Sequence, residues 1–174
     1  PEQERRWIMD GDLDSTYGRG PRVFPEFSRA IHVSKVPLAP FPGRPVIRGG
    51  DVGAVGKRIA CVARCVDSKG RTYDLREWEE EAVGITDFGW MVRQDCFSLW
   101  GQGISYYDFG DPSSMTTVSF TDKRSAADAL LEAGIVLAPG IKTQTARRES
   151  LARPMTMLLD GKPAYQIDPS CRRL

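Results

Sequence analysis

The chain has 174 residues, of which 41% are hydrophobic and 27% are charged, and its formal net charge is +1. This composition excludes a mostly disordered, collagen-like or coiled-coil chain, and it leaves a local basic patch as the only route to nucleic-acid binding. No apolar run reaches the ~18 residues of a membrane helix, and the N-terminal residues show no signal-peptide pattern, so we expect no membrane partner.

The first quarter of the chain differs in composition from the rest. Residues 1–44 are rich in glycine and proline, which predicts an irregular connecting arm with a short extended piece at 31–36. The only histidine, His32, is expected to face solvent there. Residues 45–174 are expected to form one ordered domain.

The ordered part begins with three predicted strands, at 45–49, 59–66 and 71–78. The second is apolar on both faces, which is typical of a central strand. A four-residue turn separates the second from the third, which predicts an antiparallel hairpin.

Helices and strands alternate after this hairpin. The expected elements are a helix at 86–100, a strand at 103–109, a helix that begins near 121–125 and ends at Gly134, a strand at 135–138, a helix at 145–159 interrupted by Pro154, and a strand at 164–167. The order β-β-β-α-β-α-β-α-β predicts an α/β protein with an RNase H-like mixed sheet flanked by helices.

The four cysteines do not form a plausible disulfide or zinc framework. Cys61 and Cys65 belong to one strand and would lie about 13 Å apart, too far for a disulfide bond. With a single histidine, no zinc-type cluster is present in the sequence. We therefore expect reduced, mostly buried thiols, as in a cytosolic protein.

Two acidic residues stand at strand ends. Asp51 follows the first strand and Asp111 follows the fourth, each beside small residues that allow close approach of a ligand. In the predicted sheet these strands are neighbours, so the two carboxylates would repel each other unless a divalent cation such as Mg²⁺ or Mn²⁺ binds between them. Asp108 is a weaker candidate ligand that faces differently, and Glu77 is a further acid nearby. The alternative is that Asp51 and Asp111 are ordinary turn formers.

Basic residues near the strand ends are candidates for contact with DNA phosphates. They are Arg147, Lys142, Arg148, Lys57 and Arg58. Residues 53–58 look like part of a phosphate loop, but no hydroxyl residue follows Lys57, so no nucleotide cofactor is expected.

An ordered series of short motifs resembles the nuclease domain of phage large terminase subunits. The resemblance covers about residues 22–174. Its motifs are VFPEF at 23–27, HV at 32–33, PGRPVIRGGDVG at 42–53, GDP at 110–112, TDKRS at 121–125, RRE at 147–149, LLDGKP at 158–163 and IDPSC at 167–171.

This resemblance implies a metal-dependent endonuclease of RNase H-like fold that cuts concatemeric double-stranded viral DNA during genome packaging. Asp51 matches the first catalytic aspartate, Asp111 matches the second, and both would hold a two-metal site with water as the nucleophile. Arg147 matches an arginine at the start of the late helix. The implied partners are DNA and, in the full protein, an ATPase domain, the portal and the small terminase subunit, in the cytoplasm of the infected bacterial host.

The sequence departs from the family pattern in ways that leave alternatives open. Gly50 and Val52 stand beside Asp51, where the family usually has an aromatic or hydrophobic residue and a phenylalanine. The family's third aspartate lies on a helix beyond the 167–171 motif, and Asp168 does not match it. We therefore expect that Leu174 is not the natural terminus and that cutting by residues 1–174 is slow and favours Mn²⁺. The alternatives are a catalytically incomplete module that binds DNA or the portal, and a resolvase-type nuclease of the same fold.

Overall fold

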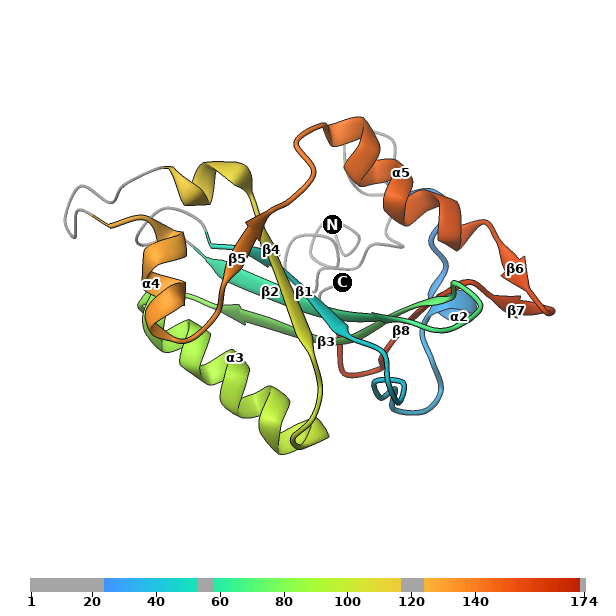
Figure 1. Ribbon diagram of the computed structural model, residues 1–174. Helices are drawn as coiled ribbons and strands as arrows, with labels where there is room; N and C mark the ends of the chain where they lie inside the picture. Colours follow the sequence, from blue (N-terminus) through green and yellow to red (C-terminus); the bar gives the residue numbers. More distant parts are fainter. Residues whose placement is uncertain (1–23, 53–57, 117–123, 173–174) are drawn as a thin grey trace, which may run out of the picture.

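The structure, a computed structural model, describes residues 24–52, 58–116 and 124–172. Its centre is a six-stranded sheet in the order β5-β4-β1-β2-β3-β8 (Figure 1). The strands are β1 (Val46–Asp51), β2 (Ile59–Val66), β3 (Thr72–Glu80), β4 (Tyr106–Gly110), β5 (Leu137–Pro139) and β8 (Tyr165–Ile167). A separate two-stranded hairpin is formed by β6 (Leu158–Leu159) and β7 (Lys162–Pro163).

The helices are α2 (Arg29–His32), α3 (Ile85–Trp100), α4 (Ala126–Glu132) and α5 (Gln144–Met155), with a 3₁₀ turn η1 (Pro112–Met115). A reciprocal capping box between Ser125 and Asp128 starts α4. Gly134 follows the C-terminal end of α4 and has a φ of 72°, a backbone conformation that favours glycine. No helix among these is long and apolar enough to cross a membrane, as far as the described residues go.

The pairing of the strands confirms the predicted mixed sheet. β1, β2 and β3 are antiparallel neighbours, whereas β4 pairs with β1, β5 with β4, and β8 with β3 in parallel. The predicted second strand matches β2 at both ends. The predicted adjacency of the first and fourth strands is also confirmed, and it places the ends of β1 and β4 side by side.

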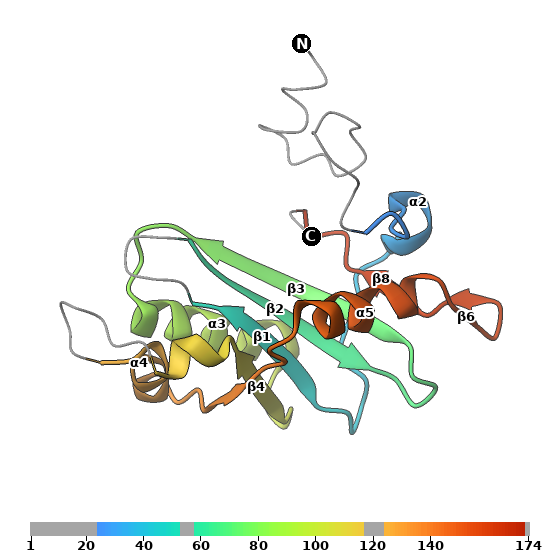
Figure 2. The ribbon, with the colours of Figure 1, turned by 90° about the horizontal axis from the view of Figure 1, so that it is seen from above.

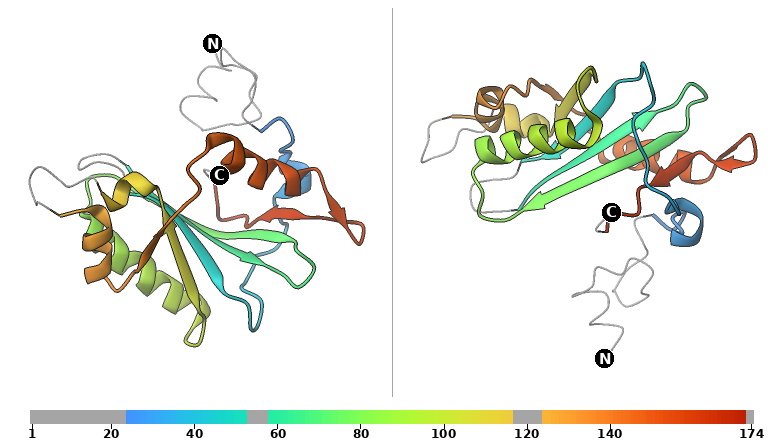
Figure 3. Two further views of the ribbon diagram at one scale, coloured as in Figure 1. Left: turned by 45° about the horizontal axis from the view of Figure 1, so that its top comes forward. Right: turned by 90° about the horizontal axis from the view of Figure 1, so that it is seen from below.

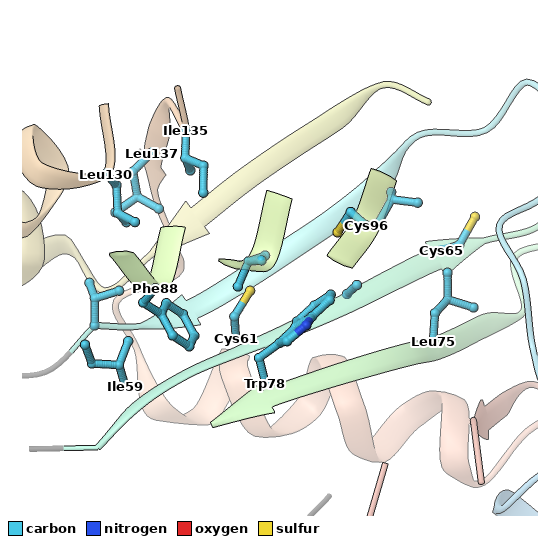
Figure 4. Close-up of a cluster of buried hydrophobic side chains, with 14 of the residues drawn as sticks. Ile59, Cys61, Cys65, Leu75, Trp78, Phe88, Cys96, Leu130, Ile135 and Leu137 are labelled. Carbon is cyan, nitrogen blue, oxygen red and sulfur yellow. The ribbon is translucent and has the colours of Figure 1, made fainter. Parts of the chain in front are cut away.

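The two faces of the sheet are covered differently. Helices α3 and α4 lie on one face, and α5 lies on the other (Figures 1 and 2). Figure 4 shows the main core between the sheet and α3, where Ile59, Cys61 and Trp78 meet Phe88 and Cys96. All four cysteines are buried and free, in agreement with the sequence-based expectation.

A second, smaller core joins the N-terminal part of the described chain to the C-terminal part. Phe27 packs with Tyr165, Ile167 and Cys171, and the partly buried side chains of α5 complete this cluster. The expectation of an irregular arm at 1–44 is therefore only partly right for its described part, 24–44, because α2 is helical and buries its last residue; residues 1–23 lie outside the described residues. The domain boundary at residue 44 stays a prediction.

His32 is the clearest error of the sequence analysis. The expected extended piece at 31–36 contains the end of α2 instead, followed by a single bridge from Val33 to Ile167. The His32 ring is only 2% exposed, stacks on Phe27 at a centroid distance of 5.5 Å, and lies 3.0 Å from the Met155 carbonyl oxygen. Tertiary contacts between distant segments bury it, and no local pattern shows them.

The hairpin β6–β7 was not predicted, although its turn has a signal. Asp160 and Gly161 both have positive φ, 53° and 72°, which is the backbone of a two-residue turn favoured by Asp-Gly. The helix expected at 145–159 ends at Met155, one residue after Pro154. Pro154 has no N–H group to donate to the carbonyl group four residues earlier, and the helix ends directly after it.

The contact between α3 and α4 predicts an unusual effect of a helical glycine. Replacing glycine by alanine inside a helix normally stabilises it by about 1 kcal/mol. At Gly89, however, an added Cβ would lie 2.7 Å from Ala133 Cβ and 3.0 Å from Leu130 Cδ2. We expect Gly89→Ala to lower the free energy of unfolding by roughly 1–3 kcal/mol through overpacking, as measured by urea denaturation.

The matched control is Ser98→Ala on the exposed part of the same helix, which is expected to leave stability unchanged or slightly raised. Equal stabilisation by both substitutions would contradict the close packing of α3 on α4.

Candidate active site

The candidate site is formed where two parallel strands end together. Gly50 of β1 is aligned with Gly110 of β4, and the preceding pairs follow the same register. Asp51 is the last residue of β1, and Asp111 directly follows β4. The fold therefore brings together the two acids that the sequence singled out, from positions 60 residues apart in the chain.

Alternation along the strands decides which face these carboxylates occupy. Val46 and Arg48 are buried on the face that α3 covers, so Gly49 and Asp51 point to the opposite face. Asp51 is exposed there, and the Asp111 side chain is 37% exposed. Both acids line one groove of about 280 Å³, together with Gly49, Gly50, Phe109, Gly110, Gly140, Ile141 and Arg147.

Arg147 supplies the positive charge of this groove. Its Nη2 atom lies 2.8 Å from Asp111 Oδ2, and its Nε–H group donates to the carbonyl oxygen of Ile141. The residue belongs to the first turn of α5, on the sheet face opposite α3; Figure 3 (left) shows the chain rising from β5 to this helix. The guanidinium thus neutralises one of the two carboxylates.

Close backbone packing holds the segment between β5 and α5 at the groove. The Gly140 N–H group donates to the Gly110 carbonyl oxygen at 2.8 Å. A Cβ at Gly140 would lie 3.0 Å from that oxygen, and one at Gly110 would lie 2.6 Å from Leu137 Cδ2. Glycine at both positions lets the chain pass near the end of β4, and this places Ile141 and Arg147 beside Asp111.

Asp108 does not reach the groove, so it is excluded as a ligand beside Asp51 and Asp111. It is aligned with Arg48 on the α3 side of the sheet, where its two oxygens accept hydrogen bonds from Nε and Nη2 at 2.6 and 2.9 Å. The Asp108 side chain is 10% exposed and that of Arg48 only 5%. The expectation that Asp108 faces differently from Asp111 is confirmed.

The other predicted DNA contacts are scattered. Lys142 is exposed and directly follows Ile141 of the groove. Arg148 points elsewhere and pairs with Glu26 at 2.7 Å. Arg58 is exposed and pairs with Glu79 at 3.0 Å, and Lys57 lies outside the described residues. Of the four members that the structure describes, Arg147 alone belongs to the groove lining.

Further acids lie on the same sheet face but not in the groove. Across the sheet, Ala60 is aligned with Asp51 on one side and with Glu79 on the other, and Glu77 lies two residues before Glu79 on β3. Glu79 is therefore two strands away from Asp51, about 10 Å at the usual strand spacing, and Glu77 is farther because it is aligned with Val62 and Gly49. Within the described residues, no group of three acidic, histidine or cysteine side chains is arranged to hold a metal ion.

The buried thiols are unsuited to metal binding. Burial raises the pKa of Cys61 to about 12, and it raises the pKa of Cys171 to about 12 as well. Since the thiolate is the form that binds metal, these residues stay neutral core side chains at physiological pH. The available donors are carboxylate oxygens, which suit hard cations such as Mg²⁺ or Mn²⁺.

Sequence reasoning missed the residues that position Arg147. Ile141 provides the carbonyl oxygen that fixes the guanidinium, and Gly140 provides the close approach to β4. The Pro139-Gly140 pair after a predicted strand is a turn signal, but it does not reveal which strand the turn approaches.

Comparison with solved structures identifies the fold. The nuclease domain of the phage P22 large terminase superposes with a TM-score of 0.61 at 15% identity, over 87% of this chain and 74% of that one. The fold is that of large terminase nuclease domains. The large terminase nuclease of thermophilic phage G20c gives a TM-score of 0.53 at 14% identity, and its structure with bound magnesium gives 0.51 at 13%, each over 85% of this chain and 74% of the other.

Sequence comparison adds no family to this structural likeness. No family model matches the chain. No curated protein matches it either. The terminase nuclease fold thus persists here at sequence identities of 13–15%.

The Arg147–Asp111 pair predicts that removing Arg147 strengthens metal binding at Asp111. Replacing Arg147 by alanine removes a cation that competes for Asp111, so Mn²⁺ should bind more tightly. Exposed ion pairs are worth about 0.2–1 kcal/mol, which corresponds to a gain of up to about five-fold in affinity. Titration calorimetry with Mn²⁺ measures this change.

Arg148→Ala is the matched control, because it removes the same side chain from the next position of α5, where the partner is Glu26. It should leave the Mn²⁺ affinity unchanged. Weaker binding in Arg147→Ala, or equal gains in both variants, would show that the cation does not compete with Arg147.

Proposed function

We propose that this chain is a divalent-metal-dependent DNA endonuclease domain that acts during viral genome packaging. The observation that supports this most is the alignment of Asp51 and Asp111 at the ends of two adjacent parallel strands, in the fold of terminase nucleases. The substrate is concatemeric double-stranded DNA, and the reaction is hydrolysis of a phosphodiester bond.

The residues of the groove fit a hard cation. Two carboxylates face the same space, and Asp111 already attracts the Arg147 guanidinium, so positive charge is favourable at this position. Gly49 leaves the floor open, since a Cβ there would have no neighbour within 4 Å. Asp51 and Asp111 would hold the metal, which activates water and stabilises the leaving oxygen when two such ions are bound.

Arg147 has a second role in this proposal. A guanidinium matches the geometry of a phosphate group and can donate two parallel hydrogen bonds to it. Once a cation neutralises Asp111, Arg147 is available to hold the DNA phosphate at the groove. Lys142, which is exposed and directly follows Ile141, adds positive charge for the sugar-phosphate backbone of the DNA.

The remaining parts of the proposal concern the assembly around the domain. By its resemblance to large terminase subunits, this domain works with an ATPase domain, the portal and the small terminase subunit. Its setting is the cytoplasm of the infected bacterial host. A second metal ion in the groove requires ligands in addition to Asp51 and Asp111.

A second candidate is a module that binds DNA or the portal without cutting. It is favoured by the composition of the groove, where two carboxylates rather than three are found among the described residues. The two candidates differ in a plasmid assay: the nuclease nicks or linearises supercoiled DNA in Mn²⁺, whereas the binding module retards it intact.

The nuclease proposal predicts that Asp51→Asn abolishes cleavage. The substitution removes the charge that anchors the cation but keeps the shape of an exposed side chain, so folding should be preserved. Plasmid nicking in Mn²⁺ should fall below detection, with an unchanged circular dichroism spectrum.

The control is Asp160→Asn, which neutralises another exposed aspartate, in the β6–β7 turn. This variant should cut like the wild type. Cleavage at the wild-type rate by a folded Asp51→Asn protein would remove Asp51 from the site.

The proposal also predicts a metal-dependent gain in stability. A ligand that binds only the folded state raises the melting temperature by mass action. Millimolar Mn²⁺ should therefore raise Tm of the wild type and raise it less in Asp111→Asn, as measured by differential scanning fluorimetry. Identical shifts in the two proteins would mean that Mn²⁺ binds elsewhere.

A further inference from the structure

A buried ion pair crosses from β1 to β4 just before the candidate site. Arg48 and Asp108 are aligned partners in the two strands, and they are joined by two hydrogen bonds of 2.6 and 2.9 Å. Asp51 follows Arg48 by three residues, and Asp111 follows Asp108 by three residues. The ion pair and the site therefore belong to the same pair of strands, on opposite faces of the sheet.

Packing fixes the Arg48 side chain from several sides. Its guanidinium carbon lies 4.4 Å from the centre of the Tyr106 ring, and Nη1 lies 3.9 Å from Cys96 Sγ on α3. With 5% of the side chain exposed, little freedom is left to the guanidinium. The guanidinium of Arg48 can thus donate both hydrogen bonds to Asp108 in one alignment of β4 with β1.

The aligned pairs of large side chains, Val46 with Tyr106 and Ile47 with Tyr107, lie before this ion pair, and between it and the site the strands contain little that specifies their alignment. Gly49 is aligned with Phe109, and Gly50 with Gly110, so three of these four positions are not able to interlock by large side chains. Glycine-rich strands specify their register weakly. A shift of two residues would keep every side chain on its face but move one aspartate by about 6.6 Å relative to the other.

We propose that Arg48 and Asp108 are positioning residues, whose buried ion pair aligns β4 with β1 and so keeps Asp51 beside Asp111. This inference rests on the proposed function of the two aspartates. It gives Asp108 a role different from metal binding, since its carboxylate is occupied on the far face of the sheet.

A role in alignment differs from a role in stability. Replacing both members of a buried ion pair by apolar residues of similar volume is often neutral or stabilising, whereas removing one member leaves an uncompensated charge. The double variant Arg48→Met/Asp108→Leu is thus expected to fold with a Tm near that of the wild type, but without the directional contact that aligns the strands.

The first test measures Mn²⁺ affinity by calorimetry well below Tm. We expect affinity to fall by about ten-fold or more in Arg48→Met, in Asp108→Asn and in the double variant. The matched control is Asp74→Asn, which breaks a similar bidentate pair between aligned residues, with Arg64, far from the groove. This control should lose stability but bind Mn²⁺ like the wild type.

The pattern separates the proposal from the other roles. A ligand role for Asp108 predicts weaker binding in Asp108→Asn and not in Arg48→Met. A merely structural role predicts equal losses in Asp74→Asn and Asp108→Asn, and full recovery in the double variant. Either result would overturn the proposal.

A second test does not depend on metal. Aligned residues of neighbouring strands are close enough for a disulfide bond, so Asp51→Cys/Asp111→Cys should cross-link on mild oxidation, as detected by peptide mass spectrometry. Adding Arg48→Met/Asp108→Leu should slow this cross-link at least about five-fold in folded protein, and an unchanged rate would overturn the proposal. If the wild type shows no Mn²⁺ site but the cross-link still depends on Arg48 and Asp108, the proposed function fails and the alignment role stands.

Discussion

The parallel pairing of β1 with β4 is the contact on which the candidate site depends. These strands are 60 residues apart in the chain, and β2, β3 and α3 lie between them in the sequence. Because parallel strands run in the same direction, their ends meet at one edge of the sheet. Carboxylates placed at the ends of the two strands are therefore brought together, although they lie far apart in the sequence.

The two faces of this strand pair serve different purposes. On the α3 side, Val46 and Leu137 belong to the main core, and Arg48 and Asp108 form an ion pair that this core encloses. On the other side, glycines leave an open groove, and the segment that leads to α5 delivers Arg147 to it. The buried face, with the Arg48–Asp108 pair, thus lies behind an exposed face on which Asp51, Asp111 and Arg147 come together.

Local sequence patterns allowed most of the fold to be predicted. The apolar run of β2, the turn that joins it to β3 and the glycine at 134 are local signals, and each was confirmed. The adjacency of β1 and β4 followed from the predicted order of elements, and it was sufficient to predict that Asp51 lies beside Asp111. These features depend on backbone geometry that a short stretch of sequence determines.

The remaining features depend on contacts between distant segments. The burial of His32 arises from Phe27 and from the end of α5. There the carbonyl group of Met155, 123 residues from His32 in the sequence, lies within hydrogen-bond distance of the ring. Likewise, the sequence around Asp108 does not show that it pairs with Arg48, and the sequence around Arg147 does not show that it pairs with Asp111. The sequence could nominate these charged residues, but only the tertiary structure assigns each of them to a face of the sheet.

The claim that Asp51 and Asp111 together hold a cation is tested most directly by anomalous diffraction. Crystals of the protein soaked in Mn²⁺ would be measured at a wavelength where manganese scatters anomalously. The account predicts a difference peak in the groove, in contact with carboxylate oxygens of both aspartates and with the Arg147 guanidinium displaced from Asp111. A peak elsewhere, or an occupied groove in which Arg147 still pairs with Asp111, would contradict it.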